Sequence, residues 1–419
     1  MERYNKYKDS GIAWLGEIPE HWEIDQLRSF LRLFSEKSHA DEQLLSVTRE
    51  QGVIVRDKDN QEENHNYIPE DLSGYKYVEK DDFVINKMKA WQGSYGVSEY
   101  TGIVSPAYYT CKLSNINRKF FSISIRSKAY VSFFASYSKG IRVGQWDLDT
   151  NALKTIPFFL PPTDEQEKIV EYIESKNLII DSYVRERERE LRLLNELKQA
   201  EIAQAVTQGL NPNVPMKECQ TPMLGKIPVH WEERKMKYCF SERSEKNHPD
   251  EPILCATQSQ GVIPQSMYAN RVVVVNKGFD GLKLVKVGDF VISLRSFEGG
   301  IEYAYYQGII SAAYTILTPI DPSQSEYFKL LFKSYPFIQL LQTCVTGIRE
   351  GQNINYSLLG RKYIPIPPSS EQKEIVTYIN DKFAKVNSLI TELEEEIAYL
   401  KEYKQRLIAD AVTGKMKVC

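Results

Sequence analysis

A stretch that occurs twice constrains the fold of this chain more than any other feature of its sequence. One copy begins LPPTDEQEKIVEYIESK at Leu160 and the other begins IPPSSEQKEIVTYINDK at Ile366. In each copy two prolines, which cannot continue inside a helix, precede a Thr, Asp or Ser suited to an N-cap and then acidic residues. The sequence therefore predicts two long helices, over residues 163–208 and 369–414.

Both predicted helices carry a narrow apolar stripe. Its residues recur at spacings of mostly three and four, and they are Ile169, Ile173, Ile180, Val184, Leu191, Leu194 and Ala205 in the first copy and Ile375, Ile379, Val386, Ile390, Leu393, Ile397, Leu400, Leu407 and Ala411 in the second. A stripe sustained over several heptads is typical of coiled-coil pairing. Each helix would be roughly 60 Å long and could not bury its stripe alone. We therefore predict that the two helices pair with each other.

The duplication extends over nearly the whole chain. WLGEIPEHWE at 14–23 returns as MLGKIPVHWE at 223–232, a shift of 209 residues. GIRVGQ at 140–145 returns as GIREGQ at 347–352, a shift of 207 residues. Because the shift stays nearly constant between these distant points, one unit has been duplicated, and the period is too long for a solenoid.

The register of the repeat also relates the two ends of the chain. Lys8-Asp9 aligns with Lys217-Glu218, which follow the first predicted helix. The N-terminal tail thus occupies the place where a linker from the second helix would arrive. We expect a circularly repeated chain with a pseudo-two-fold axis, which would set the two helices antiparallel.

Within each unit, the globular part has the pattern of short strands with a few short helices. FVI at 83–85 and 290–292, the GIVS and GIIS segments, and VVVV within 271–275 are predicted strands, while 120–137 and 327–341 are predicted short helices. The predicted fold class is α+β, with two similar globular domains separated by an antiparallel coiled coil. The predicted boundaries are 1–162 for the first domain, 163–208 for the first helix, 209–222 for a linker, 223–368 for the second domain and 369–414 for the second helix.

Composition excludes several classes of protein. No apolar run approaches the ~18 residues of a membrane span, and the N-terminus MERYNKYKDS has no signal-peptide core, so we expect a cytoplasmic protein. None of the six cysteines forms a C-x-x-C pair, and the five histidines do not cluster with them. Scattered reduced thiols are therefore expected, with no metal site and no disulfide framework.

The motifs of common catalytic sites are missing. The sequence has no G-x-x-x-x-G-K-[ST] phosphate loop, no G-x-G-x-x-G after a strand and no Asn/Asp-Pro-Pro-Tyr/Phe tetrapeptide. Glu371-Gln372-Lys373 has a nuclease-like spacing but opens a helix. His21 and His230 recur within I-P-x-H-W-E, which favours a turn or cap contact over catalysis. We assign no catalytic residue.

Charge in the first unit is strongly segregated. Residues 1–83 carry 11 Lys/Arg against 19 Asp/Glu, whereas residues 84–146 carry nine Lys/Arg against Glu99 alone. Basic residues interleaved with aromatic ones are typical of a nucleic-acid footprint. The alternative is a basic sheet face neutralised by the acidic first half. The candidate DNA-binding residues in this segment are Lys87, Lys89, Trp91, Gln92, Arg118, Lys119 and Lys139.

Further candidates come from recurrence. Arg142 and Gln145 match Arg349 and Gln352 in the GIR-x-GQ segments. Arg pairs with guanine and Gln with adenine in the major groove, although a repeated Gly-x-Arg turn could instead hold a scaffold loop. The neighbourhood of Lys87 to Gln92 matches Arg295 and Phe297 less cleanly, and the second unit shows no comparable charge segregation.

Together, the I-P-x-H-W-E segments, the GIR-x-GQ segments and the two P-P-x-x-E-Q helices resemble the specificity (S) subunit of type I restriction–modification systems. The resemblance implies that each globular domain is a target recognition domain reading one half of a bipartite, asymmetric site in double-stranded DNA. It implies that the helices fix the half-site spacing and dock two modification (methyltransferase) subunits, which methylate adenine with S-adenosylmethionine. Restriction subunits using ATP and Mg would join them, and this chain itself would hold no cofactor. The rival interpretations are a coiled-coil scaffold that does not bind DNA and a self-contained methyltransferase or nuclease.

Overall fold

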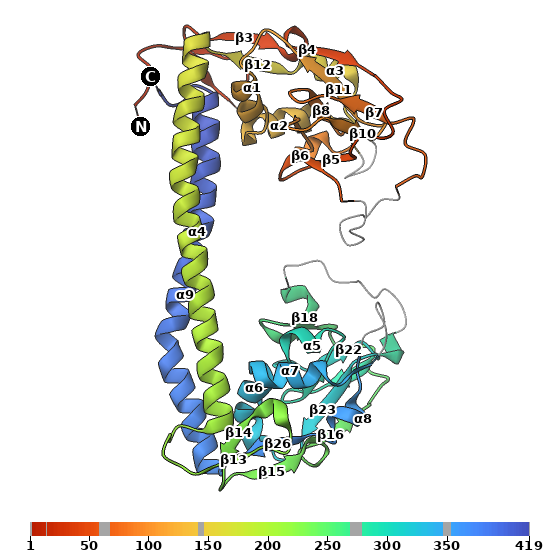
Figure 1. Cartoon of the computed structure of the whole chain (residues 1–419), viewed down its shortest axis with the longest axis vertical. Helices are drawn as coiled ribbons and strands as arrows, with labels where there is room; N and C mark the ends of the chain where they lie inside the picture. The colour runs from red at the N-terminus through yellow and green to blue at the C-terminus, as the bar shows by residue number, and fades with distance from the viewer. Residues whose placement is uncertain are drawn as a thin grey trace. The chain divides into compact units, whose positions relative to one another are not determined.

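The chain forms two compact units that share two long helices. The computed structural model describes residues 2–13, 15–57, 68–140, 146–268, 279–346 and 353–418. The first unit comprises 1–187 with 395–419, and the second comprises 188–394. The helices α4 (Thr163–Gln208) and α9 (Ser369–Val412) each contribute one end to either unit (Figure 1).

The first unit is built on a four-stranded antiparallel sheet of order β4-β11-β8-β9. Four two-stranded ladders surround it, β1-β2, β3-β12, β5-β6 and β7-β10. The strands are β1 (Tyr7–Asp9), β2 (Glu17–Pro19), β3 (Glu23–Gln26), β4 (Leu31–Phe34), β5 (Leu45–Thr48), β6 (Gly52–Val55), β7 (Lys76–Val78), β8 (Phe83–Ile85), β9 (Tyr95–Val97), β10 (Gly102–Val104), β11 (Tyr109–Leu113) and β12 (Pro157–Leu160).

The second unit repeats this topology. Its four-stranded sheet has the order β16-β23-β20-β21, and its ladders are β13-β14, β15-β26, β17-β18, β19-β22 and the short β24-β25. The strands are β13 (Met216–Glu218), β14 (Lys226–Pro228), β15 (Glu232–Lys235), β16 (Phe240–Arg243), β17 (Leu254–Thr257), β18 (Gly261–Pro264), β19 (Lys283–Val285), β20 (Phe290–Ile292), β21 (Glu302–Tyr303), β22 (Gly308–Ile310), β23 (Thr315–Pro319), β24 (Val345–Thr346), β25 (Asn353–Ile354) and β26 (Tyr363–Ile366). The predicted duplication and the predicted FVI and GIV/GII strands are confirmed. The VVVV segment within 271–275 lies outside the described residues.

Short helices follow the sheet in both units. The first unit has α1 (Arg118–Ile125), α2 (Lys128–Tyr137) and α3 (Thr150–Thr155), and the second has α5 (Ser296–Gly299), α6 (Ser325–Lys333), α7 (Tyr335–Gln342) and α8 (Tyr356–Leu359). The predicted helical segments 120–137 and 327–341 are each a pair of helices, because Ser127 and Ser334 interrupt them in extended backbone conformation.

Each core joins a globular domain to the ends of both long helices. In the first unit, Phe121 and Phe158 share one cluster with Ile169 of α4 and Leu407 of α9, and all four are at most 1% exposed. In the second unit, Phe332 shares a cluster with Val206 of α4 and Ile375 of α9. Fully burying a side chain of this size contributes about 1.5–3 kcal/mol. The apolar stripes are thus buried against the domains at their ends as well as against each other.

The two long helices run antiparallel in both units. In the first unit, the Lys404 Nζ lies 2.6 Å from Asp181 Oδ1, and the Arg187 Nε lies 3.2 Å from Glu396 Oε2. Residue numbers therefore decrease along α9 in the direction in which they increase along α4. In the second unit, the Lys382 Nζ lies 2.7 Å from Glu201 Oε2. The predicted antiparallel pairing is confirmed.

The Glu-Gln of the P-P-x-x-E-Q motif fastens each domain to its helix. Glu165 Oε2 lies 2.8 Å from the Nε2 of His21, and Glu371 Oε1 lies 2.7 Å from the Nε2 of His230. The following glutamine turns back, so that the side-chain amide of Gln166 donates to the carbonyl of Pro161 at 2.9 Å. The recurrent histidines therefore contact the start of a helix, as predicted. In each unit the I-P-x-H-W-E motif and the P-P-x-x-E-Q motif contact each other and together connect the domain to the helix.

The chain ends meet in the way the repeat register predicts. The strands β1 and β13 occupy equivalent positions, each paired with the strand that carries the Ile-Pro of I-P-x-H-W-E. The amide of Lys417, which follows α9, donates to the carbonyl of Glu2 at 2.9 Å. The N-terminal tail therefore lies next to the end of α9, in the place that residues 209–216 occupy after the end of α4. The strand β13 lies inside the segment predicted as a linker.

Candidate nucleic-acid interface

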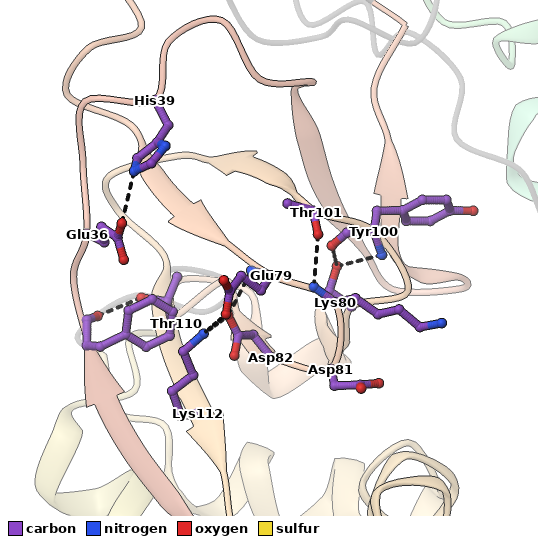
Figure 2. Close-up of polar contacts among 12 residues, drawn as sticks. Glu36, His39, Glu79, Lys80, Asp81, Asp82, Tyr100, Thr101, Thr110 and Lys112 are labelled. Atoms are coloured by element: carbon purple, nitrogen blue, oxygen red, sulfur yellow. Dashed lines mark hydrogen bonds and ion pairs between the residues drawn. The ribbon is translucent and has the colours of Figure 1, made fainter.

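The basic segment of the first domain is partly neutralised by the acidic segment before it. The Nζ of Lys112, on β11, lies 2.6 Å from Glu79 Oε2 and 3.0 Å from Asp82 Oδ2, and Figure 2 shows the three side chains converging. Asp82 is buried and also accepts from the amide of Glu79. Burial raises the pKa of Asp82, while these donors oppose that rise.

Three of the sequence candidates are also engaged with carboxylates. The Arg118 Nη1 lies 2.8 Å from Asp81 Oδ2, the Lys119 Nζ lies 2.9 Å from Glu174 Oε1 on α4, and the Lys87 Nζ lies 3.1 Å from Asp147 Oδ2. These pairs are at least partly exposed, so each contributes little to stability. They nevertheless show that much of the local charge excess is balanced within the unit.

Of the cations predicted within residues 84–146, Lys89 and Lys139 remain exposed without a carboxylate within 4 Å among the described residues. Lys89 precedes the 3-10 helix η2 (Ala90–Gln92). Lys139 forms a backbone bridge with Asp147, each amide donating to the other's carbonyl at 2.9 Å. Both lysines are therefore free to meet an anionic partner.

The aromatic candidate Trp91 packs within the unit. Its ring lies 4.9 Å from that of Trp146, centroid to centroid, and its buried Nε1 finds no hydrogen-bond acceptor among the described residues. Gln92 follows it and is half-buried.

The four recurrent Arg and Gln candidates, Arg142, Gln145, Arg349 and Gln352, lie outside the described residues. The residues that flank them are equivalent in the two units. The Lys139–Asp147 bridge spans the first segment, and the β24-β25 ladder spans the second. Their predicted role in DNA binding stays a prediction.

The second-unit candidates lie on α5, which corresponds to η2. Arg295 is exposed at the N-cap of this helix, and Phe297 is half-buried against the core. Both η2 and α5 end in a glycine with positive φ, Gly93 at 92° and Gly300 at 86°. At Gly300 an added Cβ would lie 2.2 Å from the carbonyl of Phe332, so only glycine fits there.

The sequence analysis did not identify a cation that holds a hairpin turn in each domain. Arg126, at the end of α1, donates to the carbonyls of Tyr95, Arg49 and Glu50 at 2.6, 2.9 and 2.7 Å. Its equivalent Lys333, at the end of α6, donates to the carbonyls of Gln258 and Gly299 at 3.1 and 2.8 Å. Arg126 and Lys333 are 207 residues apart, which is the same offset that relates the FVI strands of the two repeats. This shared offset was the sequence signal that could have identified them as equivalent.

Lys333 differs from Arg126 in also pairing with a buried carboxylate. Its Nζ lies 2.5 Å from Oε1 of Glu302. This glutamate is 2% exposed, and its Oε2 finds no hydrogen-bond partner in the part of the chain that the structure describes. Burial raises the pKa of Glu302 to about 7, against the opposing effect of Lys333. This carboxyl therefore titrates near neutral pH.

We expect Glu302→Gln to flatten the pH dependence of the second unit's stability. The folded chain keeps the Glu302 proton to about pH 7, while the unfolded chain loses it near 4.5. The free energy of unfolding should thus fall, by on the order of 3 kcal/mol at most, as pH rises between these values. Urea unfolding at about pH 5 and about pH 8 measures the effect. Parallel pH profiles for the variant and the wild type would contradict this assignment.

The described residues show no sign of two other kinds of site. Within them, no three His, Cys, Asp or Glu side chains are grouped as metal ligands would be. No helix in the described part of the chain is both long and apolar enough to cross a bilayer.

Comparisons with known proteins agree on one family. The sequence model of the type I restriction modification DNA specificity domain matches residues 229–399. The putative type I restriction enzyme MjaX specificity subunit of Methanocaldococcus jannaschii is 22% identical over 432 aligned residues, covering 96% of each chain. The EcoKI specificity subunit of Escherichia coli is 20% identical, covering 96% of this chain and 90% of its own.

A solved structure shares the fold over almost the full length. It comes from work on the complex assembly and conformational transition of the type I R-M system, and it superposes with a TM-score of 0.62 at 15% identity, covering 95% of this chain and 99% of the other. The matches to the two relatives and to this structure extend through both domains and both long helices. On this combined ground, residues 229–399 match the DNA specificity domain of type I restriction–modification systems, and the whole chain is similar in sequence to specificity subunits of that family.

Proposed function

We propose that the chain reads a bipartite, asymmetric DNA site, one half with each globular domain, and that it supplies no catalytic group itself. One observation carries this proposal. The two units share a four-stranded sheet, four surrounding ladders and the joint to the long helices, yet they present different side chains on the connecting loops. A common scaffold with unlike surfaces suits two different half-sites.

The long helices would act as the spacer and as the docking surface for partners. Pairs of apolar side chains four residues apart, and hence on one helix face, are exposed on both helices. They are Ile179 with Tyr183 and Leu193 with Leu197 on α4, and Tyr399 with Tyr403 on α9. Since such rows mark association surfaces, we assign them to two modification subunits. Adenine methylation with S-adenosylmethionine, and restriction with ATP and Mg, would belong to the partners.

The salt dependence of DNA binding tests the proposal. Binding through phosphates releases counterions, so affinity should fall steeply with salt, and Lys89→Ala should reduce the slope of log affinity against log salt by about one. Lys119→Ala is the matched control, because that ammonium already pairs with Glu174, and it should keep the wild-type slope. A flat salt response of the assembled complex would favour a scaffold that does not bind DNA.

A further inference from the structure

Each domain projects a hairpin with the same tight turn. The turn between β5 and β6 runs from Thr48 to Gly52, and the turn between β17 and β18 runs from Thr257 to Gly261. In both, the threonine Oγ1 accepts from the amide three residues on, at 3.1 and 3.0 Å, and donates to the glycine carbonyl. The glycines have φ values of 75° and 74°. The backbone of the two turns is therefore the same.

A cation at the junction of two short helices, later in the sequence of the same domain, binds the backbone of each turn. Arg126 binds the carbonyls of Arg49 and Glu50 in the first domain, and Lys333 binds that of Gln258 in the second. These donors bind backbone carbonyls, so they fix the turn without engaging its side chains, which remain exposed. A turn fixed in this way presents its side chains with little conformational entropy left to lose on binding.

The side chains presented on the two turns are exposed and different. The first domain presents Arg49, Glu50 and Gln51, and the second presents Gln258, Ser259 and Gln260. These are residue types that recognise base edges, since Arg pairs with guanine, Gln with adenine and Glu with cytosine. A two-stranded β-ribbon is also one of the two elements that the major groove of B-DNA admits.

The turns lie beside the η2 and α5 segments, which carry the exposed cations. A Cβ at Gly93, next to η2, would lie 4.0 Å from Cγ of Arg49, and a Cβ at Gly299, in α5, would lie 2.7 Å from Cγ of Gln258. Lys89 precedes η2, and Arg295 precedes α5. Each domain thus has a polar turn next to a segment suited to a phosphate contact.

We propose that the turns Arg49–Gln51 and Gln258–Gln260 read base edges in the major groove of double-stranded DNA, each in its own half-site. Arg126 and Lys333 are positioning residues that hold these turns. The inference rests on the proposed function and deepens it, because it names the residues that determine specificity. The two turns share one backbone conformation but present different exposed side chains, as expected if each turn reads a different half-site sequence.

The test uses the complete complex of this chain with its modification partner, and it measures methylation across a library of sites with single base changes. The double variant Arg49→Ala/Gln51→Ala should lose about 10- to 100-fold of discrimination at one or two base pairs of one half-site. Gln258→Ala/Gln260→Ala should do the same in the other half-site. Arg28→Ala and Gln220→Ala remove exposed side chains of the same types elsewhere on the two units and should keep the wild-type profile.

The positioning role has its own readout. Arg126→Leu should relax the same base pairs as the Arg49→Ala/Gln51→Ala variant, and Arg126→Lys should restore discrimination, since lysine fills this position in the second domain. A general folding defect would lower methylation of all sites alike, and that result would overturn the positioning role. If the wild type methylates a bipartite site and the turn variants keep its profile, the turns are not the reading elements. A wild-type complex with no sequence preference would overturn the proposed function itself.

Discussion

Replacing residues 27–156 with the corresponding segment of a known type I specificity subunit is expected to change one half of the recognised site completely and to leave the other half unchanged. The physical basis is the joint between the domain and the rest of the chain. The ladder β3-β12 closes the domain, and at its end the amide of Leu27 donates to the carbonyl of Ile156 at 2.9 Å. Because the segment enters and leaves at adjacent points, it can be exchanged without moving α4.

The second domain supplies the matched exchange. There the ladder β15-β26 closes the domain, and the amide of Met236 donates to the carbonyl of Lys362 at 3.0 Å. Exchanging residues 236–362 should alter the opposite half-site. Methylation sequencing of DNA from cells that express each chimaera with its partner measures both results. A change in both half-sites from a single exchange would contradict modular reading.

The donor segment must also complete a core that reaches into the helices. In the first unit, side chains from the exchanged segment, such as Phe121, pack in one cluster with Ile169 and Ile173 of α4. A transplanted segment that lacks side chains packing against these isoleucines would leave a cavity. Each large side chain lost would then lower the free energy of unfolding by about 2–5 kcal/mol. Thermal unfolding of the chimaera distinguishes this failure from a failure of recognition.

Charge placed on the exposed face of α4 is expected to abolish assembly with the modification subunit. Ile179 and Tyr183 are 51% and 53% exposed, so Ile179→Asp/Tyr183→Glu should leave the fold intact. If these side chains anchor a partner, burying two carboxylates there should weaken binding on the order of 100-fold or more. Co-purification and analytical ultracentrifugation of the mixed subunits measure the loss.

Arg185→Glu is the control for this surface. Arg185 is exposed and lies two residues beyond Tyr183, about 200° around the helix, so it belongs to a different face. This variant should assemble as the wild type does. Normal assembly of the Ile179→Asp/Tyr183→Glu variant would exclude this face as the docking surface, and loss of assembly in both variants would point to a net charge effect along α4.

The candidate interface was only partly predictable from the sequence. The count of basic residues in 84–146 suggested a footprint, yet Lys112, Arg118 and Lys119 pair with carboxylates that are 30 to 55 residues away in the chain. Such pairs depend on which strands and helices become neighbours, and a local count of charge cannot reveal them. The equivalence of Arg126 and Lys333 was likewise hidden, because arginine and lysine at one position of the repeat become informative only when both are seen to hold the same turn.

The sequence by itself determined the duplication, the two long helices, their antiparallel order and the short strands of the domains. It did so because repetition, helical periodicity and proline stops are properties of the chain read in order. Only the tertiary structure decided which charges remain free, that the histidine of I-P-x-H-W-E contacts the glutamate of P-P-x-x-E-Q, and that the helix ends complete the domain cores. These features arise from contacts between residues far apart in sequence, and their energies depend on burial and distance, which exist only in the folded chain.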